Sequence, residues 1–417
     1  MLHGRLCLIF GPESKSPNKI LRSAAPFQVS VFRQLLKPLD RRVVSRFVDE
    51  HGGNRGVGTG DGAWTCERHL RALLFGQLTG LSSLREIVEG LSARPGGLYH
   101  AGAALARRST LSDASKARPA AVFRDIAQHL MGLLTRELRQ EGVALIRLVD
   151  GSPIPIRDGR FSWAQADSRV RGLRLHLAYD PRAVHPVHFA LETPKVSELK
   201  VARGLAVEAG ATYVFDKGYT DYGWWRHLVD GGALFVTRLK NNACRRDIQP
   251  RAFSGDGILN DQTVKIGHKK PRGGANNPLY DTAVREVVVE RPGKAPLYLV
   301  TNDFQRSATE IADLYKERWQ IELFFKWIKQ NLKIKAFHGR SENTVRIQIY
   351  VAIIAFCLLR LFQKTFARSH KGGAKAILTR LKVALFSPFD RTGKAPPPPK
   401  PPQCRLTHPQ LAFDLSA

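Results

Sequence analysis

Hydrophobic residues change their spacing along the chain, and the first change separates a helical region from a strand-rich one. From residue 27 to residue 140 they recur every three or four positions, as in VFRQLLKPLDRRVVSRFVDE and SLREIVEGL, a period typical of amphipathic helices. Ser83 begins the second run and Glu86 follows three positions later, which is the spacing of a helix capping box. We therefore expect a helical N-terminal domain at residues 27–140, preceded by a disordered leader at residues 1–26.

Residues 141–244 have the short apolar runs of a sheet. VALIRLVD, GLRLHLAYD and HPVHFALE predict three strands, because their apolar positions alternate or nearly so. SELKVARGLAVEAG predicts a helix ending at Gly210, followed by the strand ATYVFDKGY, the helix GWWRHLVDG and the strand ALFVTRL. This order of elements predicts an α/β fold whose sheet has mixed strand directions.

The remainder of the chain divides into three parts. Residues 245–303 contain the strand-like runs TVKIG, AVREVVVER and PLYLVTN without a helix, which predicts a β-rich insertion. Residues 304–370 are helical, and their apolar run IYVAIIAFCLL at 349–359 is much shorter than the ~20 residues of a membrane span, so we expect a core helix and no membrane partner. Residues 371–417 are basic and rich in proline, which predicts a disordered tail.

Charge narrows the class of partner. The chain carries 65 Lys and Arg against 36 Asp and Glu, a net charge of +29 that is spread along its length. Such a surface favours polyanions, nucleic acid before anionic membrane. The five cysteines are odd in number and form no CxxC pair, which argues against a disulfide framework and a structural zinc site and for a reducing compartment.

The predicted helix at residues 314–333 carries an unusual polar stripe. At about 100° per residue, Tyr315, Arg318, Glu322 and Lys329 share one narrow arc of a helix that is otherwise largely apolar. One interpretation is a solvated face in which Glu322 pairs with Arg318 and Lys326, worth about 0.2–0.5 kcal/mol per pair. The other is that Glu322 belongs to a site built from more carboxylates.

Two further carboxylates have the context of such a site. Asp150 and Asp216 each follow a short apolar strand, and Gly151 and Gly218 come within two residues of them. Strand ends of α/β sheets are where active sites form, although an Asp there also caps turns. Converging with Glu322, they would repel one another unless a divalent cation bound them, and oxygen-only ligands suit Mg²⁺ or Mn²⁺. Two such ions, about 3.5–4 Å apart, promote phosphoryl transfer.

Two other features leave alternatives open. His176 lies two strand positions from Arg174, so it either faces the same cleft as Asp150 or has a structural role. Trp224 and Trp225 have the chemistry to stack on an unpaired base, but a place in the core fits them better.

These residues carry a resemblance to a known family. Asp150, Asp216 and Glu322 resemble the DDE triad of transposases with an RNase H-like core. The spacing Y-x2-R-x3-E-x6-K matches the signature of the insertion-sequence-four family of bacterial transposases at Tyr315, Arg318, Glu322 and Lys329. The separations are 216 − 150 = 66 and 322 − 216 = 106 residues, and the longer one resembles that family's β-strand insertion. The resemblance covers roughly residues 27–365.

The resemblance implies a function and a role for each site residue. The chain would bind the terminal inverted repeats of an insertion sequence through its helical domain, cleave DNA there and join the 3′-hydroxyl to target DNA. Self-association on DNA and a bacterial cytoplasmic location at the nucleoid are implied as well. Two Mg²⁺ ions, replaceable by Mn²⁺, would be ligated by Asp150, Asp216 and Glu322. Phosphates near the element's end would contact Tyr315, Arg318 and Lys329.

Two alternative functions remain open from the sequence. One is an RNase H-like DNA nuclease or resolvase that cuts structured DNA without strand transfer. The other is an inactive DNA-binding remnant that keeps only the basic surface. Mg²⁺-dependent nicking of DNA that carries the element's ends distinguishes all three.

Overall fold

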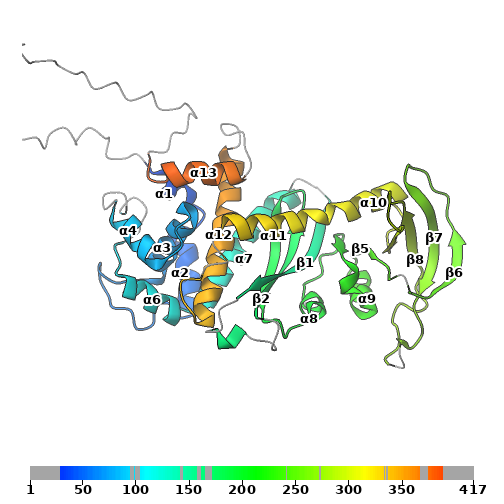
Figure 1. The fold of residues 1–417 in the computed structure, drawn as a ribbon, viewed down its shortest axis with the longest axis horizontal. Helices are drawn as coiled ribbons and strands as arrows, with labels where there is room; N and C mark the ends of the chain where they lie inside the picture. The colour runs from blue at the N-terminus through cyan, green and yellow to red at the C-terminus, as the bar shows by residue number, and fades with distance from the viewer. Residues whose placement is uncertain are drawn as a thin grey trace, which may run out of the picture.

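The computed structural model describes residues 29–93, 98, 104–140, 144–156, 161–164, 171–240, 242–271, 274–332, 334, 337–366 and 374–387. The predicted leader at residues 1–26 lies outside these residues. Three parts follow one another along the longest axis of the molecule, with helices at one end, a sheet in the middle and β-strands at the other end (Figure 1). The long helical segment α10–α11 runs across the sheet toward the strand-rich end (Figure 1).

The N-terminal part is helical. Its helices are α1 (Val31–Leu35), α2 (Arg41–Glu50), α3 (Cys66–Thr79), α4 (Leu84–Ser92), α6 (Arg108–Ala117) and α7 (Ala120–Gln140). The single run expected over residues 31–50 is two helices, because Pro38 interrupts it and the Asp40 side chain caps α2 by accepting from the Val43 N–H at 2.8 Å. At α4 the Ser83 side chain accepts from the Glu86 N–H at 3.2 Å, while Glu86 reaches back to the Ser82 N–H at 2.7 Å.

One sheet of nine strands contains both the core and the insertion. The core strands are β1 (Ile146–Pro155), β2 (Gly172–Asp180), β3 (His185–Glu192), β4 (Thr212–Phe215) and β5 (Leu234–Arg238). Their order is β3-β2-β1-β4-β5, with β2 antiparallel to both neighbours and β1, β4 and β5 mutually parallel. This is the arrangement of an RNase H-like core, so the predicted fold class is confirmed.

The insertion extends the core sheet. Its strands are β6 (Arg245–Pro250), β7 (Ile258–Ile266), β8 (Val284–Val289) and β9 (Leu297–Thr301), and β9 pairs antiparallel with β5. The sequence analysis missed β6, whose residues RRDIQP are mostly polar and half-exposed or exposed at the edge of the sheet. Because β9 joins β5, the insertion and the core share one continuous sheet.

Helices cover both faces of the core sheet. One face carries α8 (Glu198–Arg203) and α9 (Tyr222–Asp230), and the other carries α10 (Ala308–Glu317), α11 (Trp319–Asn331) and α12 (Glu342–Phe366). Helix α8 ends at Arg203 rather than at Gly210. The predicted helix at 314–333 is divided at Arg318, which ends α10 and precedes α11 with helical backbone angles. The boundary between α10 and α11 therefore falls at Arg318 of the signature.

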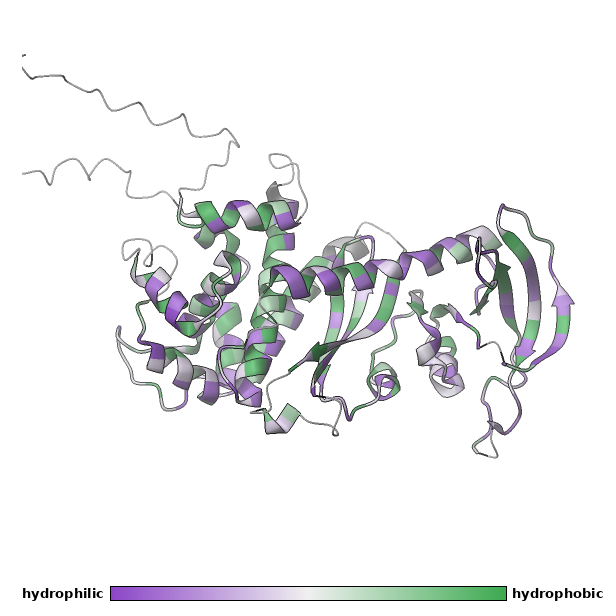
Figure 2. Ribbon diagram, viewed as in Figure 1, coloured by the Kyte–Doolittle hydropathy of each residue, from purple (hydrophilic) through white to green (hydrophobic). Residues whose placement is uncertain are grey.

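The predicted core helix is longer than its apolar run, and one further helix lies in the predicted tail. The apolar run at 349–359 is the middle of α12, which is long and apolar enough to cross a membrane by length and composition but is mostly buried inside the fold. Figure 2 shows α12 hydrophobic along most of its length. Residues 374–384, expected in a disordered tail, form α13 (Ala374–Ala384), because Leu378 and Leu381 join the helical core. The tail beyond residue 387 lies outside the described residues.

Candidate active site

The two strand aspartates lie side by side at one edge of the sheet. The parallel pairing of β1 with β4 ends at Val149 and Phe215, so Asp150 and Asp216 are the next residues on the two strands. Val149 and Phe215 face the core under α8 and α9, and because strand residues alternate, both aspartates face α10 and α11. Asp150 does not end its strand, since β1 continues to Pro155 along β2. It is the first residue beyond the parallel pairing.

The α10–α11 segment is attached to both of these strands by its polar stripe. The Tyr315 hydroxyl donates to Asp216 Oδ1 at 3.2 Å, and Lys329 Nζ donates to Ser152 Oγ on β1 at 2.6 Å. Between them, Arg318 pairs with Glu322 over 2.8 Å. The structure thus brings together all six residues of the predicted site, namely Asp150, Asp216, Tyr315, Arg318, Glu322 and Lys329.

The charges at this edge act on one another. The pKa of Asp150 is raised to about 6, mainly by burial; the Gly151 N–H and the Arg318 charge lower it, and the negative charges of Glu198 and Glu322 raise it. Burial also raises the pKa of Tyr315 to about 12, with a further contribution from Asp216, so this hydroxyl is a neutral donor. A buried carboxyl with a raised pKa and two further carboxylates nearby is the electrostatic setting that a bound cation would relieve.

The donor set fits a hard divalent cation in type. It consists of carboxylates, and Mg²⁺ and Mn²⁺ prefer oxygen ligands. Within the described residues, however, Asp150, Asp216 and Glu322 do not present one ligand oxygen each within 4.8 Å of one another. The group whose ligand atoms do lie that close is Glu50, His51 and Asp125, through two carboxylates and a ring nitrogen. Glu322 instead bonds Arg318. Ligation by all three carboxylates therefore requires Glu322 to turn away from Arg318.

Three side chains near the site do not share its cleft. In the β1–β2 register His176 lies opposite Gly151 and Leu177 lies opposite Asp150, so His176 and Arg174 occupy the α8 face of the sheet. His176 is buried with both ring nitrogens unpaired among the described residues, and burial lowers its pKa to about 4. The interpretation that places His176 beside Asp150 is therefore wrong. Lys326 is exposed on α11, where Arg318 takes the pairing with Glu322.

Trp224 and Trp225 have the core role that was expected of them. Their side chains are almost fully buried on α9, among the aromatic residues under the sheet. A buried indole is not placed to stack on a DNA base, so the binding alternative does not hold for either residue.

Sequence reasoning missed two residues at this edge. Arg238 ends β5, the strand next to β4, and its Nη1 lies 3.9 Å from Asp216 Oδ1. Glu198 begins α8, bonds Arg174 and lies near Gly218, so it borders the two aspartates from the opposite face. The available signal was position at a strand end or a helix start, and it becomes useful only when the strand order is known.

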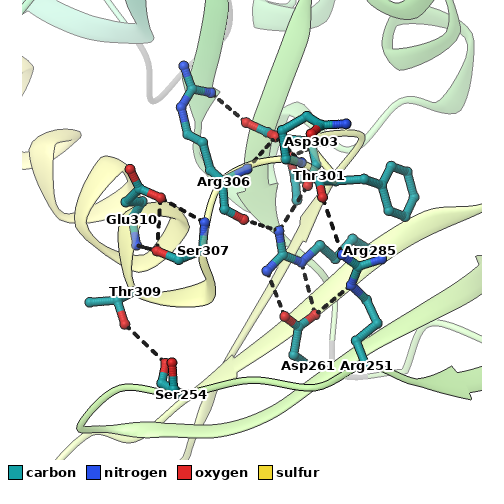
Figure 3. Close-up of polar contacts among 12 residues, drawn as sticks. Arg251, Ser254, Asp261, Arg285, Thr301, Asp303, Arg306, Ser307, Thr309 and Glu310 are labelled. Atoms are coloured by element: carbon teal, nitrogen blue, oxygen red, sulfur yellow. Dashed lines mark hydrogen bonds and ion pairs between the residues drawn. The ribbon is translucent and has the colours of Figure 1, made fainter.

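A buried ion pair in the insertion holds the loop that precedes α10. Arg285 of β8 donates two hydrogen bonds to Asp261 of β7, at 2.9 and 2.6 Å, and another to the Asp303 carbonyl at 3.2 Å (Figure 3). Both charged side chains are almost fully buried. Breaking such a pair by removing one partner is strongly destabilising, so the contact connects the insertion firmly to this loop.

The same loop is attached to the core and starts the helix. Arg306 donates to the Asp303 carboxylate at 2.5 Å and to Thr212 of β4 at 3.1 Å. Ser307 and Glu310 then form the capping box of α10 (Figure 3). Helix α10 therefore begins from a loop fixed to β4 and β8, and this position directs Tyr315 and Glu322 toward the edge of the sheet.

Comparisons with known proteins identify the family of the chain. A family model described as a transposase DDE domain matches residues 141–358, more than half of the chain, and a model of a domain of unknown function (DUF4372) matches residues 28–104.

Three relatives are named as transposases. The chain is 42% identical to y4zB of Sinorhizobium fredii, over 60% of this chain and 70% of that protein. It is 28% identical to the transposase for insertion sequence element IS5377 of Geobacillus stearothermophilus, over 62% and 68% of the two chains. It is 27% identical to transposase InsG for insertion sequence element IS4 of Escherichia coli, over 44% and 42%.

Among solved structures, the piggyBac transposase in a synaptic complex with hairpin DNA is similar at a TM-score of 0.49 and 10% identity. The similarity covers 86% of this chain and 80% of that one.

Proposed function

Because this chain belongs to the DDE transposase family and is related to the transposases of IS4-type insertion sequences, we propose that it cleaves DNA at the ends of an insertion sequence and joins the freed 3′-hydroxyl to target DNA. One observation carries the proposal. The α10–α11 segment presents Glu322 to the edge formed by Asp150 and Asp216, and the bonds of Tyr315 to Asp216 and Lys329 to Ser152 hold it there.

The three carboxylates are the proposed ligands of one or two Mg²⁺ ions, with Mn²⁺ as a substitute. When bound, such ions supply activation of the attacking oxygen and stabilisation of the leaving oxygen in phosphoryl transfer. The chain's own contribution is to hold Asp150 and Asp216 on adjacent parallel strands and to bring in Glu322 from a helix. A cation beside Asp150 also offsets the negative charge that raises its pKa.

The polar stripe is proposed to hold the substrate phosphates. Arg318 Nε is buried and has no hydrogen-bond partner among the described residues, so a donor remains for a phosphate oxygen. If Glu322 turns toward a cation, the Nη1 of Arg318 is released for the same phosphate. Tyr315 remains a neutral donor because its pKa is raised to about 12. Lys329 lies two turns beyond Glu322 and places a positive charge beside Ser152.

The proposed substrate is double-stranded DNA, as terminal inverted repeats and as target. A net charge of +29 supports a polyanionic partner. We further propose self-association on DNA, because joining two ends of an element requires a protomer at each, and a location at the bacterial nucleoid. The solved piggyBac complex contains hairpin DNA.

The test is cleavage of a supercoiled plasmid that carries the element's ends, in Mg²⁺ and in EDTA. We expect nicks at the ends in Mg²⁺ alone, followed by joined products when target DNA is added. Cutting of four-way junctions regardless of end sequence would indicate the resolvase alternative. Binding of the ends without any cutting in Mg²⁺ or Mn²⁺ would indicate an inactive DNA-binding remnant.

A further inference from the structure

A polar pocket lies away from the active site, where the helical part meets the segment between α11 and α12. Its volume is about 410 Å³, and it opens between the start of α4, the start of α6 and residues 337–338. Hydroxyl and guanidinium groups make up most of its polar lining, which comprises Ser82, Ser83, Arg85, Arg108, Ser112 and His338. No residue of the proposed catalytic site contributes to it.

The two arginines of this pocket differ from most arginines near the core. Arg85 and Arg108 are exposed, and within the described residues neither side chain forms an ion pair or hydrogen bond. Helix α6 begins here as well, and Arg107, the residue before it, makes no side-chain cap. The nearest carboxylate, Glu86, is already bonded to the Ser82 N–H and hydroxyl. The pocket therefore carries two exposed guanidinium groups, on Arg85 and Arg108, that form no ion pair within the described residues.

Helix α6, which forms one wall of the pocket, is bonded to the start of α12. The Asn343 side chain at the start of α12 donates to the carbonyls of Ser115 and Arg118 at the end of α6, at 3.1 and 2.7 Å. Thr344 donates to the Ser115 carbonyl at 3.1 Å. The backbone of α6, from which Arg108 projects, is therefore fixed to the start of α12.

We propose that this pocket binds a phosphate of the DNA backbone, outside the catalytic site and on the same duplex. Guanidinium groups and hydroxyls are the usual ligands of backbone phosphates. Phe337 of the pocket lies eight residues after Lys329 in sequence, and we infer that a duplex contacting the α11 stripe extends to the pocket. The inference rests on the proposed DNA substrate. Its consequence is that the helical part and the core hold one duplex jointly, which sets its position relative to Glu322.

The experiment compares the two pocket arginines with a third exposed arginine of the helical part, Arg136. Fluorescence anisotropy with a labelled linear duplex of mixed sequence is measured from ~50 to ~200 mM salt for the full chain, for Arg85→Ala/Arg108→Ala and for Arg136→Ala. Arg136 is exposed on α7 and does not line the pocket. We expect the double variant to weaken binding about tenfold at low salt and to reduce the salt slope by about 1–2, with little change for Arg136→Ala.

A second pair of variants adds charge instead of removing it. Ser112→Asp places a carboxylate in the pocket, and Gln128→Asp places one at an exposed position of α7. We expect only Ser112→Asp to weaken DNA binding, with thermal melting used to verify that both variants fold. If Ser112→Asp does not fold, the arginine pair decides, since removing exposed side chains leaves the core intact.

Three outcomes would overturn the inference. The first is an unchanged salt slope for Arg85→Ala/Arg108→Ala, and the second is an effect of Arg136→Ala on DNA binding that equals the effect of the double variant. The third is that inorganic phosphate shifts the melting temperature of the wild type and not of the double variant, while both bind DNA equally well. Cleavage is measured separately in Mg²⁺. A wild type that binds through the pocket but never cuts would contradict the proposed function and leave this inference standing.

Discussion

The two faces of the sheet near Asp150 differ in how completely their charged side chains are paired. On the α8 face, Arg147 is almost fully buried and bonds Asp180 at 2.7 Å and Glu208 at 2.8 and 2.9 Å. Arg174 on the same face bonds Glu198. These charges have partners of opposite sign, and Arg147 and Asp180 are almost fully buried.

On the α10–α11 face the charges are only partly compensated. Asp150 has a raised pKa, Arg318 has a buried Nε without a partner among the described residues, and Glu322 has a single arginine and a side chain that is 34% exposed. Fully paired charges stabilise a fold, whereas incompletely paired ones keep binding capacity for a ligand. The comparison predicts that substitutions on the α8 face unfold the protein and that those on the α11 face inactivate it.

The largest effect is expected from the carboxylates of the α11 face. Losing a residue that hydrogen-bonds a metal ligand costs about 10–100-fold in activity. Asp150→Ala, Asp216→Ala and Glu322→Ala each remove a proposed ligand itself, so each should reduce Mg²⁺-dependent cleavage by more than that. DNA affinity should stay within a few-fold, because the role assigned to these residues is ligation. Plasmid nicking and anisotropy measure the two effects. Normal cutting by any one variant would remove that residue from the proposed triad.

The next effect is on stability and comes from the α8 face. Asp180→Ala removes a buried partner of Arg147, and breaking a buried pair in this way costs about 3–5 kcal/mol. Urea denaturation measures the loss, with the exposed pair Arg226–Asp230 as control, where Asp230→Ala should change stability by less than about 1 kcal/mol. A folded and inactive Asp180→Ala would contradict the division between the two faces.

The features of the fold and the site that the sequence predicted are those set by interactions between residues close in sequence. Fold class, family and enzyme type are confirmed, and they depended on local periods and on spacing within one helix. The six site residues were identified from strand ends and the α11 stripe, and the structure brings them together; their roles remain predictions. The faces of His176 and Arg174 were not predictable, because a register of paired strands decides them.

Other differences have equally local causes. Strand β6 lacks the apolar alternation of a strand, since it lies at the edge of the sheet. The division at Arg318 leaves no mark in the hydrophobic pattern, because the residue keeps helical angles. Arg238 lies 22 residues from Asp216 in sequence (238 − 216 = 22), and only the parallel pairing of β4 with β5 brings them together.

A smaller effect is expected from the phosphate contacts of the α11 face. Arg318→Ala and Lys329→Ala should lower cleavage and strand transfer about 10²-fold, because a misplaced phosphate reacts slowly, while the melting temperature changes little. Arg318→Lys keeps the charge but loses the two-pronged geometry, so its activity should recover only in part. Unfolding of Arg318→Ala would show that the stripe is a structural ladder of ion pairs. Full activity in both alanine variants would make these side chains solvated surface.

The smallest effect is a pH dependence on the α8 face. Burial lowers the pKa of His185 to about 4, with opposing contributions from its bond to the Pro186 carbonyl and from Asp180, and lowering contributions from Lys364 and Arg360. The folded state therefore keeps this imidazole neutral where the unfolded state, with a pKa near 6.5, binds a proton. Stability from this group is fully present above about pH 6.5 and is lost as the pH falls toward 4, by up to ~1.4 kcal/mol per pH unit. Urea denaturation at pH 7, 6 and 5, repeated with His185→Gln, measures this dependence, whose slope should be smaller in the variant. An unchanged slope would mean that His185 binds a proton in the folded state. The α8 face would then accept a further positive charge besides that of the paired Arg147.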